Sequence, residues 1–227
     1  MKVQIFCDGS YFINNSKQQC RDNNIKLDLN ELPHLLVKTL SDKMKEPLTY
    51  TSMIFTASIP SNVSAKDKLA LSKQKHFFEV LKNKCGYTVE LFEIDFKGKR
   101  ILKQDRGNDP WEPKEKCVDI AVATNLLFYK DQYDIAILIT GDRDFLPAIN
   151  KATQLGKQIV IASFLDSCSK EFKDIIWLDT LLPHMIFDDS ENKNETTSKI
   201  LLSIDDLLVG PLELPKDITL KTLGESI

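Results

Sequence analysis

Histidine, glycine and closely spaced cysteine are scarce in this sequence, and each scarcity excludes a class of function. The 227 residues include three histidines, eight glycines and five cysteines. No C-x-x-C pair of the kind used by structural zinc sites is present, and the scattered histidines argue against a histidine-based catalyst. Neither G-x-x-x-x-G-K nor G-x-G-x-x-G occurs, so no loop for ATP or a dinucleotide is predicted.

Long apolar segments are also missing. No run approaches the roughly 20 residues needed to span a bilayer, and no signal-peptide pattern opens the chain. The cysteines are odd in number and lie mostly in apolar or helical surroundings, which favours reduced thiols that serve in packing. We therefore expect a cytoplasmic protein without a membrane partner.

The charge of the whole molecule does not favour a polyanionic partner, because the net charge is −3. Residues 97–106 are an exception, with five basic side chains and one acid between Phe96 and Trp111. This run indicates either a solvated loop or a surface that binds the phosphates of RNA. The candidates for nucleic-acid binding are Lys97, Lys99, Arg100, Lys103 and Arg106, with Lys114 and Lys116 beyond them.

Apolar runs that end in turn residues predict six strands, and helical patterns lie between them. The strands are expected at 3–7, 49–57, 87–96, 135–139, 158–162 and 175–178, and the helices at 28–45, 64–84, 113–130 and 144–155. In the third helix, Pro113 is expected in the first turn, with Ile120, Ala123 and Leu127 on one face. A wholly aliphatic strand such as 135–139 is typical of burial on both faces. The pattern predicts an α/β fold with a mostly parallel sheet between helical layers.

The composition changes after Pro183, where a polar run of linker character begins. The chain length suits one domain of ordinary size with an appendage. We expect a main domain at 1–182, a polar linker at 183–199 and a short segment at 200–227. That last segment is too small to fold alone. It is expected to dock on the main domain, on a second copy or on another protein, or to remain a tail.

Acidic residues follow two of the expected strands. Asp8 comes after strand 3–7, and Asp142 and Asp144 come after strand 135–139, so they should meet at the carboxyl edge of the sheet. Asp119 lies early in an apolar helix, where a charge needs a partner. Taken singly, Asp8 could be a turn residue and Asp142 a helix N-cap. Taken together, clustered carboxylates repel unless a cation lies among them, and their oxygens favour Mg²⁺ or Mn²⁺.

Three blocks of sequence resemble those of the NYN (LabA-like) domain family, within the PIN-like nuclease superfamily. The blocks are FCDGS at 6–10, KCVDIA at 116–121 and TGDRDFLP at 140–147. Residues 155–157 and 174–178 also resemble the closing segment of that family, so that the resemblance covers roughly residues 1–182. It implies a PIN-like three-layer α/β/α sandwich, a centre that binds Mg²⁺ or Mn²⁺, and ribonuclease activity on RNA.

The resemblance also implies roles for single residues. Asp8, Asp119, Asp142 and Asp144 would be the catalytic residues and the metal ligands. The orienting residues would be Ser10 and Thr140, through their hydroxyls, and Asn125. Relatives often carry Asn where this chain has Tyr11 and an acid where it has Asn125, so either one or two metal ions remain open.

Two other functions compete with the ribonuclease. The first is a non-catalytic module that keeps the fold and binds RNA or a protein partner, with the basic residues binding phosphates and the acids serving only the structure. The second is a phosphatase of the haloacid-dehalogenase type with Asp8 as nucleophile. That chemistry needs a second carboxylate two residues later, where this chain has Ser10. The phosphatase is therefore the weakest of the three.

Overall fold

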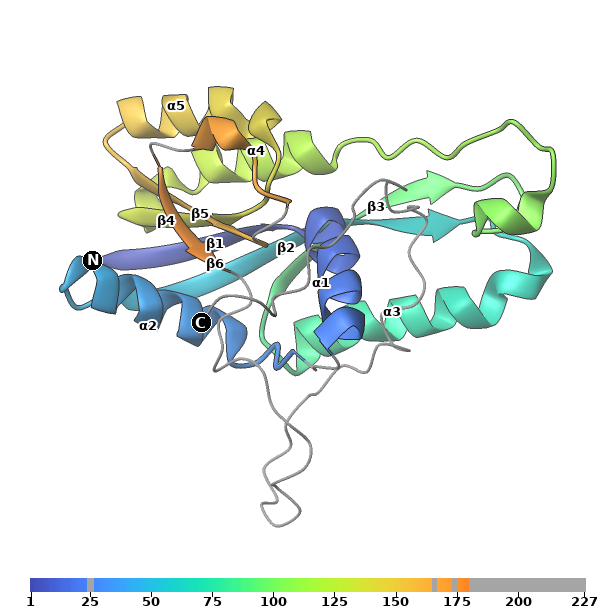
Figure 1. Cartoon of the computed structure of the whole chain (residues 1–227), viewed down its shortest axis with the longest axis horizontal. Helices are drawn as coiled ribbons and strands as arrows, with labels where there is room; N and C mark the ends of the chain where they lie inside the picture. Colours follow the sequence, from blue (N-terminus) through green and yellow to red (C-terminus); the bar gives the residue numbers. More distant parts are fainter. Residues whose placement is uncertain (24–26, 165–166, 173–174, 180–227) are drawn as a thin grey trace, which may run out of the picture.

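A six-stranded sheet lies at the centre of the computed structural model, which describes residues 1–23, 27–164, 167–172 and 175–179 (Figure 1). The strands are β1 (Lys2–Asp8), β2 (Thr49–Ser61), β3 (Thr88–Asp95), β4 (Ile135–Ile139), β5 (Gln158–Ser163) and β6 (Ile176–Asp179). Their order in the sheet is β3-β2-β1-β4-β5-β6, and every neighbouring pair is parallel. The predicted parallel sheet is confirmed.

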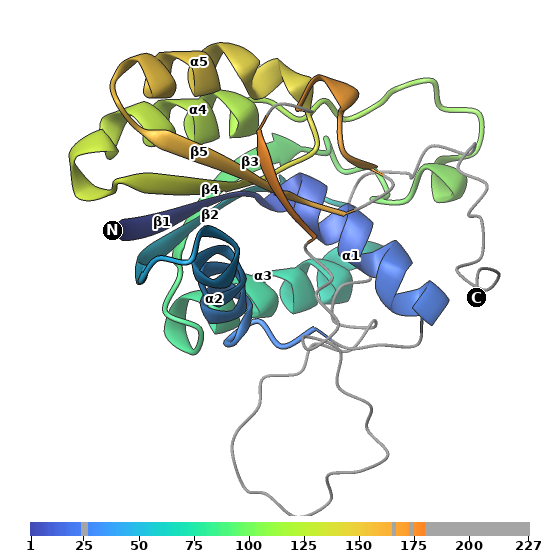
Figure 2. The same ribbon diagram turned by 60° about the vertical axis from the view of Figure 1, so that its left-hand side comes forward.

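Helices cover both faces of this sheet (Figures 1 and 2). On one face lie α1 (Gly9–Asn23), α2 (Leu32–Met44) and α3 (Lys68–Asn83), and on the other lie α4 (Val118–Phe128) and α5 (Leu146–Gln154). Short 3-10 turns occur at η1 (Ala65–Asp67), η2 (Lys103–Arg106), η3 (Lys130–Gln132), η4 (Arg143–Phe145) and η6 (Lys170–Phe172). The result is the three-layer α/β/α architecture that the sequence predicts.

Alternation along the strands divides the interior into two cores. Ile5 and Cys7 of β1 face the first core, where they join Phe12 of α1 and Leu36 of α2. Phe6 points to the opposite side and joins the second core beneath α4 and α5. All five residues of β4 are buried, as expected for a strand covered on both faces. A central strand of this kind holds its carboxyl end in a fixed position.

The chain changes direction in the sheet between β1 and β4. From β1 it passes outward to β2 and β3 through helices on one face, and then returns to β4 and continues to β5 through helices on the other. Such a reversal leaves a crevice beyond the carboxyl ends of the two adjacent strands. Cys7 pairs with Ile139, so Asp8, the last residue of β1, and Thr140, the first residue after β4, lie at the same level of the sheet edge.

Helix α1 was not predicted, because residues 9–23 are mostly polar and show no clear apolar periodicity. Its place is set by packing against β2, which the sequence does not show. Phe12 lies edge-on to Phe55 with ring centroids 5.9 Å apart. At the start of the helix, a Cβ on Gly9 would lie 2.5 Å from Phe55 Cε1 and 2.8 Å from the Thr56 carbonyl oxygen. Only glycine allows β1 to turn into α1 this close to β2.

Helix α4 begins at Val118, so the predicted start at Pro113 is wrong. Cys117 has a φ of 76°, a left-handed conformation that interrupts a right-handed helix. Ile120 is 71% exposed, and the buried residues of α4 are Val118, Val122 and Leu126. The buried face of α4 is therefore not the predicted one. Because α4 is apolar on nearly every side, the spacing of its apolar residues does not show which side is buried.

Strand β2 is longer than predicted, since it continues past Pro60 to Ser61 in register with Asp95 of β3. The linker predicted at 183–199 and the segment predicted at 200–227 lie outside the described residues. In the part of the chain that is described, no helix is both long and apolar enough to cross a membrane.

Candidate acidic site at the sheet edge

Asp8 is the buried carboxylate of the candidate site, with only 6% of its surface exposed. Its Oδ1 accepts a hydrogen bond of 3.0 Å from the Tyr11 backbone N–H in the first turn of α1. Burial raises the pKa of Asp8 to about 7, and the negative charges of Asp119 and Glu115 add to the rise, although the Tyr11 bond opposes it. A negative charge on Asp8 is therefore unfavourable unless a cation compensates it.

Asp142 and Asp144 lie in the loop that leaves β4. Asp142 Oδ1 accepts a bond of 2.9 Å from the Asp144 backbone N–H, and thereby caps η4. The Asp142 backbone N–H donates to Thr140 Oγ1 over 3.2 Å, so that Thr140 fixes the start of the loop. Asp142 thus has the capping role that its sequence context allowed, and both aspartates are exposed at the crevice.

Asp119 lies in the first turn of α4 and interacts with acids at the ends of both strands, β1 and β4. Partial burial raises its pKa, and the nearby charges of Glu115, Asp142 and Asp144 raise it further. Asp119 also contributes to the rise at Asp8. Asp119 therefore interacts electrostatically with each of the other three predicted aspartates.

Glu115 is a fifth acid at this place, and the sequence did not single it out. Its Oε2 accepts bonds of 2.6 Å from both Ser10 Oγ and Ser58 Oγ. Ser10, predicted to orient one of the aspartates or a phosphate, donates instead to Glu115. These partners lie 105 and 57 residues away in the chain, and no motif joins them. We call the acids Asp8, Glu115, Asp119, Asp142 and Asp144 the acidic centre.

Asn125, the third predicted orienting residue, contacts a different acid. Its Nδ2 donates to Glu90 Oε2 of β3 over 2.6 Å, and Thr56 Oγ1 donates to the same oxygen over 3.4 Å. A carboxylate at position 125 would face Glu90 and be repelled. The amide of Asn125 can instead donate a hydrogen bond to the carboxylate of Glu90.

The donor chemistry of the acidic centre fits a hard divalent cation, because every candidate ligand is a carboxylate oxygen and the neighbouring acids raise the pKa of Asp8 and of Asp119. The arrangement is not a closed cage, however. Among the described residues, no group of three or more His, Cys, Asp or Glu side chains has the geometry to hold a metal ion. Asp8, Asp119 and Asp142 would have to draw together around an ion.

Most of the basic run is paired, mainly with acids of its own region and in one case with Asp67 of η1. Three of its cations form salt bridges, and a fourth donates to a backbone carbonyl. The pairs are Lys99 with Asp109, Arg100 with Asp67 and Asp105, Lys103 with Glu112, and Arg106 with the Trp111 carbonyl. These contacts hold the 97–116 region together. In contrast, Lys97, Lys114 and Lys116 form no ion pair within the described residues.

Gly141 permits a close approach between the β4 loop and the segment after β5. A Cβ there would lie 1.7 Å from the Ser167 carbonyl oxygen and 2.8 Å from Tyr11 Cε2. Gly141→Ala is therefore expected to lower the free energy of unfolding by about 3 kcal/mol, because backbone has to shift. Urea unfolding measures this, with Lys151→Ala at an exposed site of α5 as the control, expected to change by less than about 0.5 kcal/mol. Equal midpoints for the two variants would show that the loop has room here.

A solved structure of a protein of unknown function from Vibrio parahaemolyticus is similar to this chain. The identity is 17% and the TM-score 0.46, over 78% of this chain and 93% of that one. Among curated proteins there is no match. The family model described as "NYN domain" matches residues 2–178, which include the acidic centre and all of the sheet but its last residue, Asp179. The chain therefore belongs to the NYN domain family.

Proposed function

We propose that this protein is a metal-dependent endoribonuclease that hydrolyses phosphodiester bonds of RNA at the acidic centre. The observation that carries the proposal is the convergence of five acids from β1, the β4 loop and the region of α4, among which Asp8 is buried with its pKa raised to about 7. Like charges are gathered here at the cost of stability, which indicates a functional role. Membership of a nuclease-like family supports the same assignment.

Each residue has a distinct part in the proposed reaction. Asp8, Asp119 and Asp142 would hold Mg²⁺ or Mn²⁺, and Asp144 would position the attacking water. Thr140 keeps the Asp142 backbone in place through the bond to its amide. When bound, the ion would supply activation of water and stabilisation of the charge that develops on the phosphate.

The test is cleavage of labelled RNA by the purified full chain. Single-stranded and hairpin RNA are incubated with Mn²⁺, with Mg²⁺ or with EDTA, beside the Asp142→Asn variant prepared in the same way. We expect cleavage with either metal, none with EDTA and little with the variant. Cleavage that persists in EDTA and in Asp142→Asn would reveal a contaminating nuclease and would contradict the proposal.

The absence of a closed cage in the described residues favours a second candidate, a module that binds RNA or a protein partner without cleavage. In that case the intact chain would bind RNA but produce no fragments under any of the metal conditions. The same incubation therefore distinguishes the two, when it is read both for fragments and for retained complex.

A further inference from the structure

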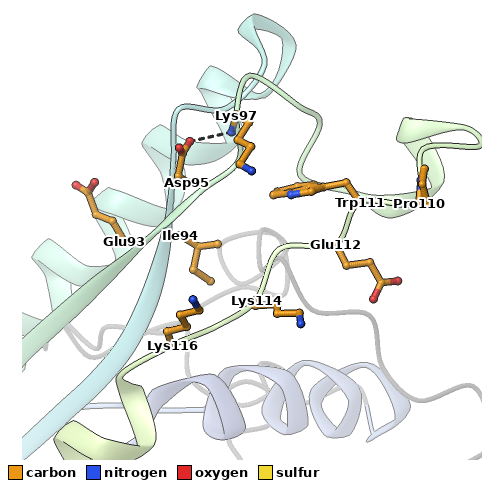
Figure 3. A pocket seen from close by; sticks show the side chains of 9 residues that line it. All are labelled: Glu93, Ile94, Asp95, Lys97, Pro110, Trp111, Glu112, Lys114 and Lys116. Carbon is orange, nitrogen blue, oxygen red and sulfur yellow. Dashed lines mark hydrogen bonds between the residues drawn. The ribbon is translucent and has the colours of Figure 1, made fainter.

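A cavity of about 670 Å³ opens beyond the carboxyl end of β3, beside the acidic centre (Figure 3). Glu93, Ile94 and Asp95 form one wall, and the chain from Pro110 to Lys116 forms the other. Pockets for small molecules generally have about 300–1,000 Å³, so this one has room for a nucleotide unit. An indole ring, three lysines and three acids line this space. Of the acids, Asp95 accepts hydrogen bonds from the Asn62 side chain and the Lys97 backbone N–H, and Glu112 pairs with Lys103.

The lysines of the cavity are Lys97, Lys114 and Lys116. None of the three forms an ion pair in the described part of the chain, whereas Lys99, Arg100 and Lys103 are paired with acids and Arg106 donates to the Trp111 carbonyl. Paired cations offer little to a phosphate, because their acids would have to be displaced. Lys97, Lys114 and Lys116 are therefore the lysines of the cavity that a phosphate could contact without displacing a salt-bridged acid.

Trp111 forms the apolar part of the wall. Phe96, which is fully buried, supports it edge-on, with ring centroids 5.8 Å apart. Lys99 Nζ, Arg106 Cζ and Lys97 Nζ lie over the indole ring, 5.1, 5.7 and 5.9 Å from its centre. The ring is half-buried and has positive charge close to it. An aromatic ring accompanied by cations is the combination that binds a nucleic-acid base together with its flanking phosphates.

The cavity and the acidic centre are joined by consecutive residues. Lys114 and Lys116 line the cavity, and Glu115 between them accepts hydrogen bonds from Ser10 and Ser58 in the acidic centre. A strand of nucleic acid whose phosphates contact these lysines would be led directly to the acids.

We propose that this cavity is a base-stacking subsite for single-stranded RNA, in which Trp111 stacks on a base and Lys97, Lys114 and Lys116 contact the adjacent phosphates. The subsite rests on the proposed function in that it would guide the strand to the acidic centre. It requires unpaired bases, since a base within a duplex cannot reach the face of the indole.

The first test measures the affinity of the full chain for a 12-nucleotide oligoadenylate in EDTA, where no metal-dependent cleavage occurs. Trp111→Leu keeps an apolar contact with Phe96 but removes the stacking face, and should weaken binding roughly 5- to 100-fold. Trp111→Phe keeps an aromatic face and should bind within about threefold of the unaltered chain. An abasic strand of the same length should bind equally well to all three proteins. Equal affinity of Trp111→Leu and the unaltered chain for oligoadenylate would overturn the proposal.

A second measurement does not depend on the folding of Trp111→Leu. The chain has two tryptophans, so Trp177→Phe leaves Trp111 as the single emitter. Stacking of a base should quench this emission when oligoadenylate is added, and inorganic polyphosphate should not quench it. Unchanged emission at saturating oligoadenylate would contradict stacking, and equal quenching by polyphosphate would reduce the site to a simple anion-binding surface.

The lysines are tested by charge-matched variants. Replacing Lys97, Lys114 and Lys116 together by Gln should make the dependence of log affinity on log salt shallower by roughly 2, because each phosphate contact on a single strand contributes about 0.7. The control replaces Lys38, Lys73 and Lys82 by Gln, three exposed lysines of α2 and α3. It changes the net charge equally and should leave the slope unchanged. Equal slopes for the two variants would refute the phosphate contacts.

Failure of the subsite and failure of the proposed hydrolysis give different results. If oligoadenylate binding depends on Trp111 but no RNA is cut with Mn²⁺ or Mg²⁺, the subsite is upheld and the protein is a binding module. If RNA is cut but Trp111→Leu binds normally, the hydrolysis is upheld and the subsite is refuted.

Discussion

Asp142→Asn should reduce metal-dependent RNA cleavage by more than about 100-fold, since even the loss of a group that only supports a metal ligand reduces activity about 10- to 100-fold. The substitution is small in every other respect. The amide Oδ1 of Asn can still accept the bond from the Asp144 backbone N–H, so η4 keeps its cap. What disappears is one negative charge in a crowded acidic centre. The loss of activity is therefore expected with no loss of stability, and with a slightly higher melting temperature.

The same variant gives a measurement that needs no substrate. Mn²⁺ should raise the melting temperature of the unaltered chain, because an ion that binds only the folded state stabilises it. The rise should be much smaller in Asp142→Asn. Asp131→Asn is the matched control, since Asp131 is exposed at η3 and pairs with Lys130 outside the acidic centre. Equal Mn²⁺ shifts in all three proteins would show that Asp142 serves only as a cap.

Asp8→Asn should make the metal-free protein more stable above pH 7 and change it little near pH 4. The folded state raises the pKa of Asp8 to about 7 from an ordinary value of 3.8. Between pH 4 and pH 7, Asp8 has lost its proton in the unfolded chain but retains it in the folded chain. The free energy of unfolding therefore falls as the pH rises through this range. Above pH 7 the full penalty is present. It amounts to up to about 4 kcal/mol, since one pKa unit corresponds to about 1.4 kcal/mol.

Urea unfolding in EDTA at pH 4, 5.5, 7 and 8.5 measures this effect. The difference between Asp8→Asn and the unaltered chain isolates Asp8 from other groups that titrate, such as Glu171, whose pKa is lowered by Ser169 and Arg143 and which acts in the opposite sense. Asn can still accept the Tyr11 bond through its carbonyl oxygen. A difference that stayed constant from pH 4 to 8.5 would mean that Asp8 is ionised as easily as on a surface.

The strands and the acids at their ends could be predicted because both depend on local sequence. An aliphatic run such as 135–139 shows that it is buried, and Asp8 and Asp142 follow directly after such runs. Parallel pairing then places both acids at one edge of the sheet, and this inference needs no knowledge of side-chain contacts. The match of the NYN family model to residues 2–178 agrees with the resemblance seen in the sequence.

The rest of the site depends on contacts between distant segments. Glu115 enters the acidic centre only because Cys117 delays the start of α4 and leaves residues 111–116 free to cross the sheet edge. The pairing of the basic run is equally hidden, since Arg100 meets Asp67 from a different part of the chain. The sequence shows that these charged residues exist, but only their salt-bridge partners show which of them can still bind a ligand.

The placement of Lys114, Glu115 and Lys116 on consecutive positions has a thermodynamic consequence. A strand bound to the lysines and a cation bound among the acids would act on the same three residues of backbone, with Ser10 and Ser58 holding the middle one. If bound RNA changes the affinity for the cation by some factor, the bound cation must change the affinity for RNA by the same factor. The affinity of the unaltered chain for a non-hydrolysable oligoadenylate analogue, measured with and without Mn²⁺, would thus report this coupling between adjacent residues.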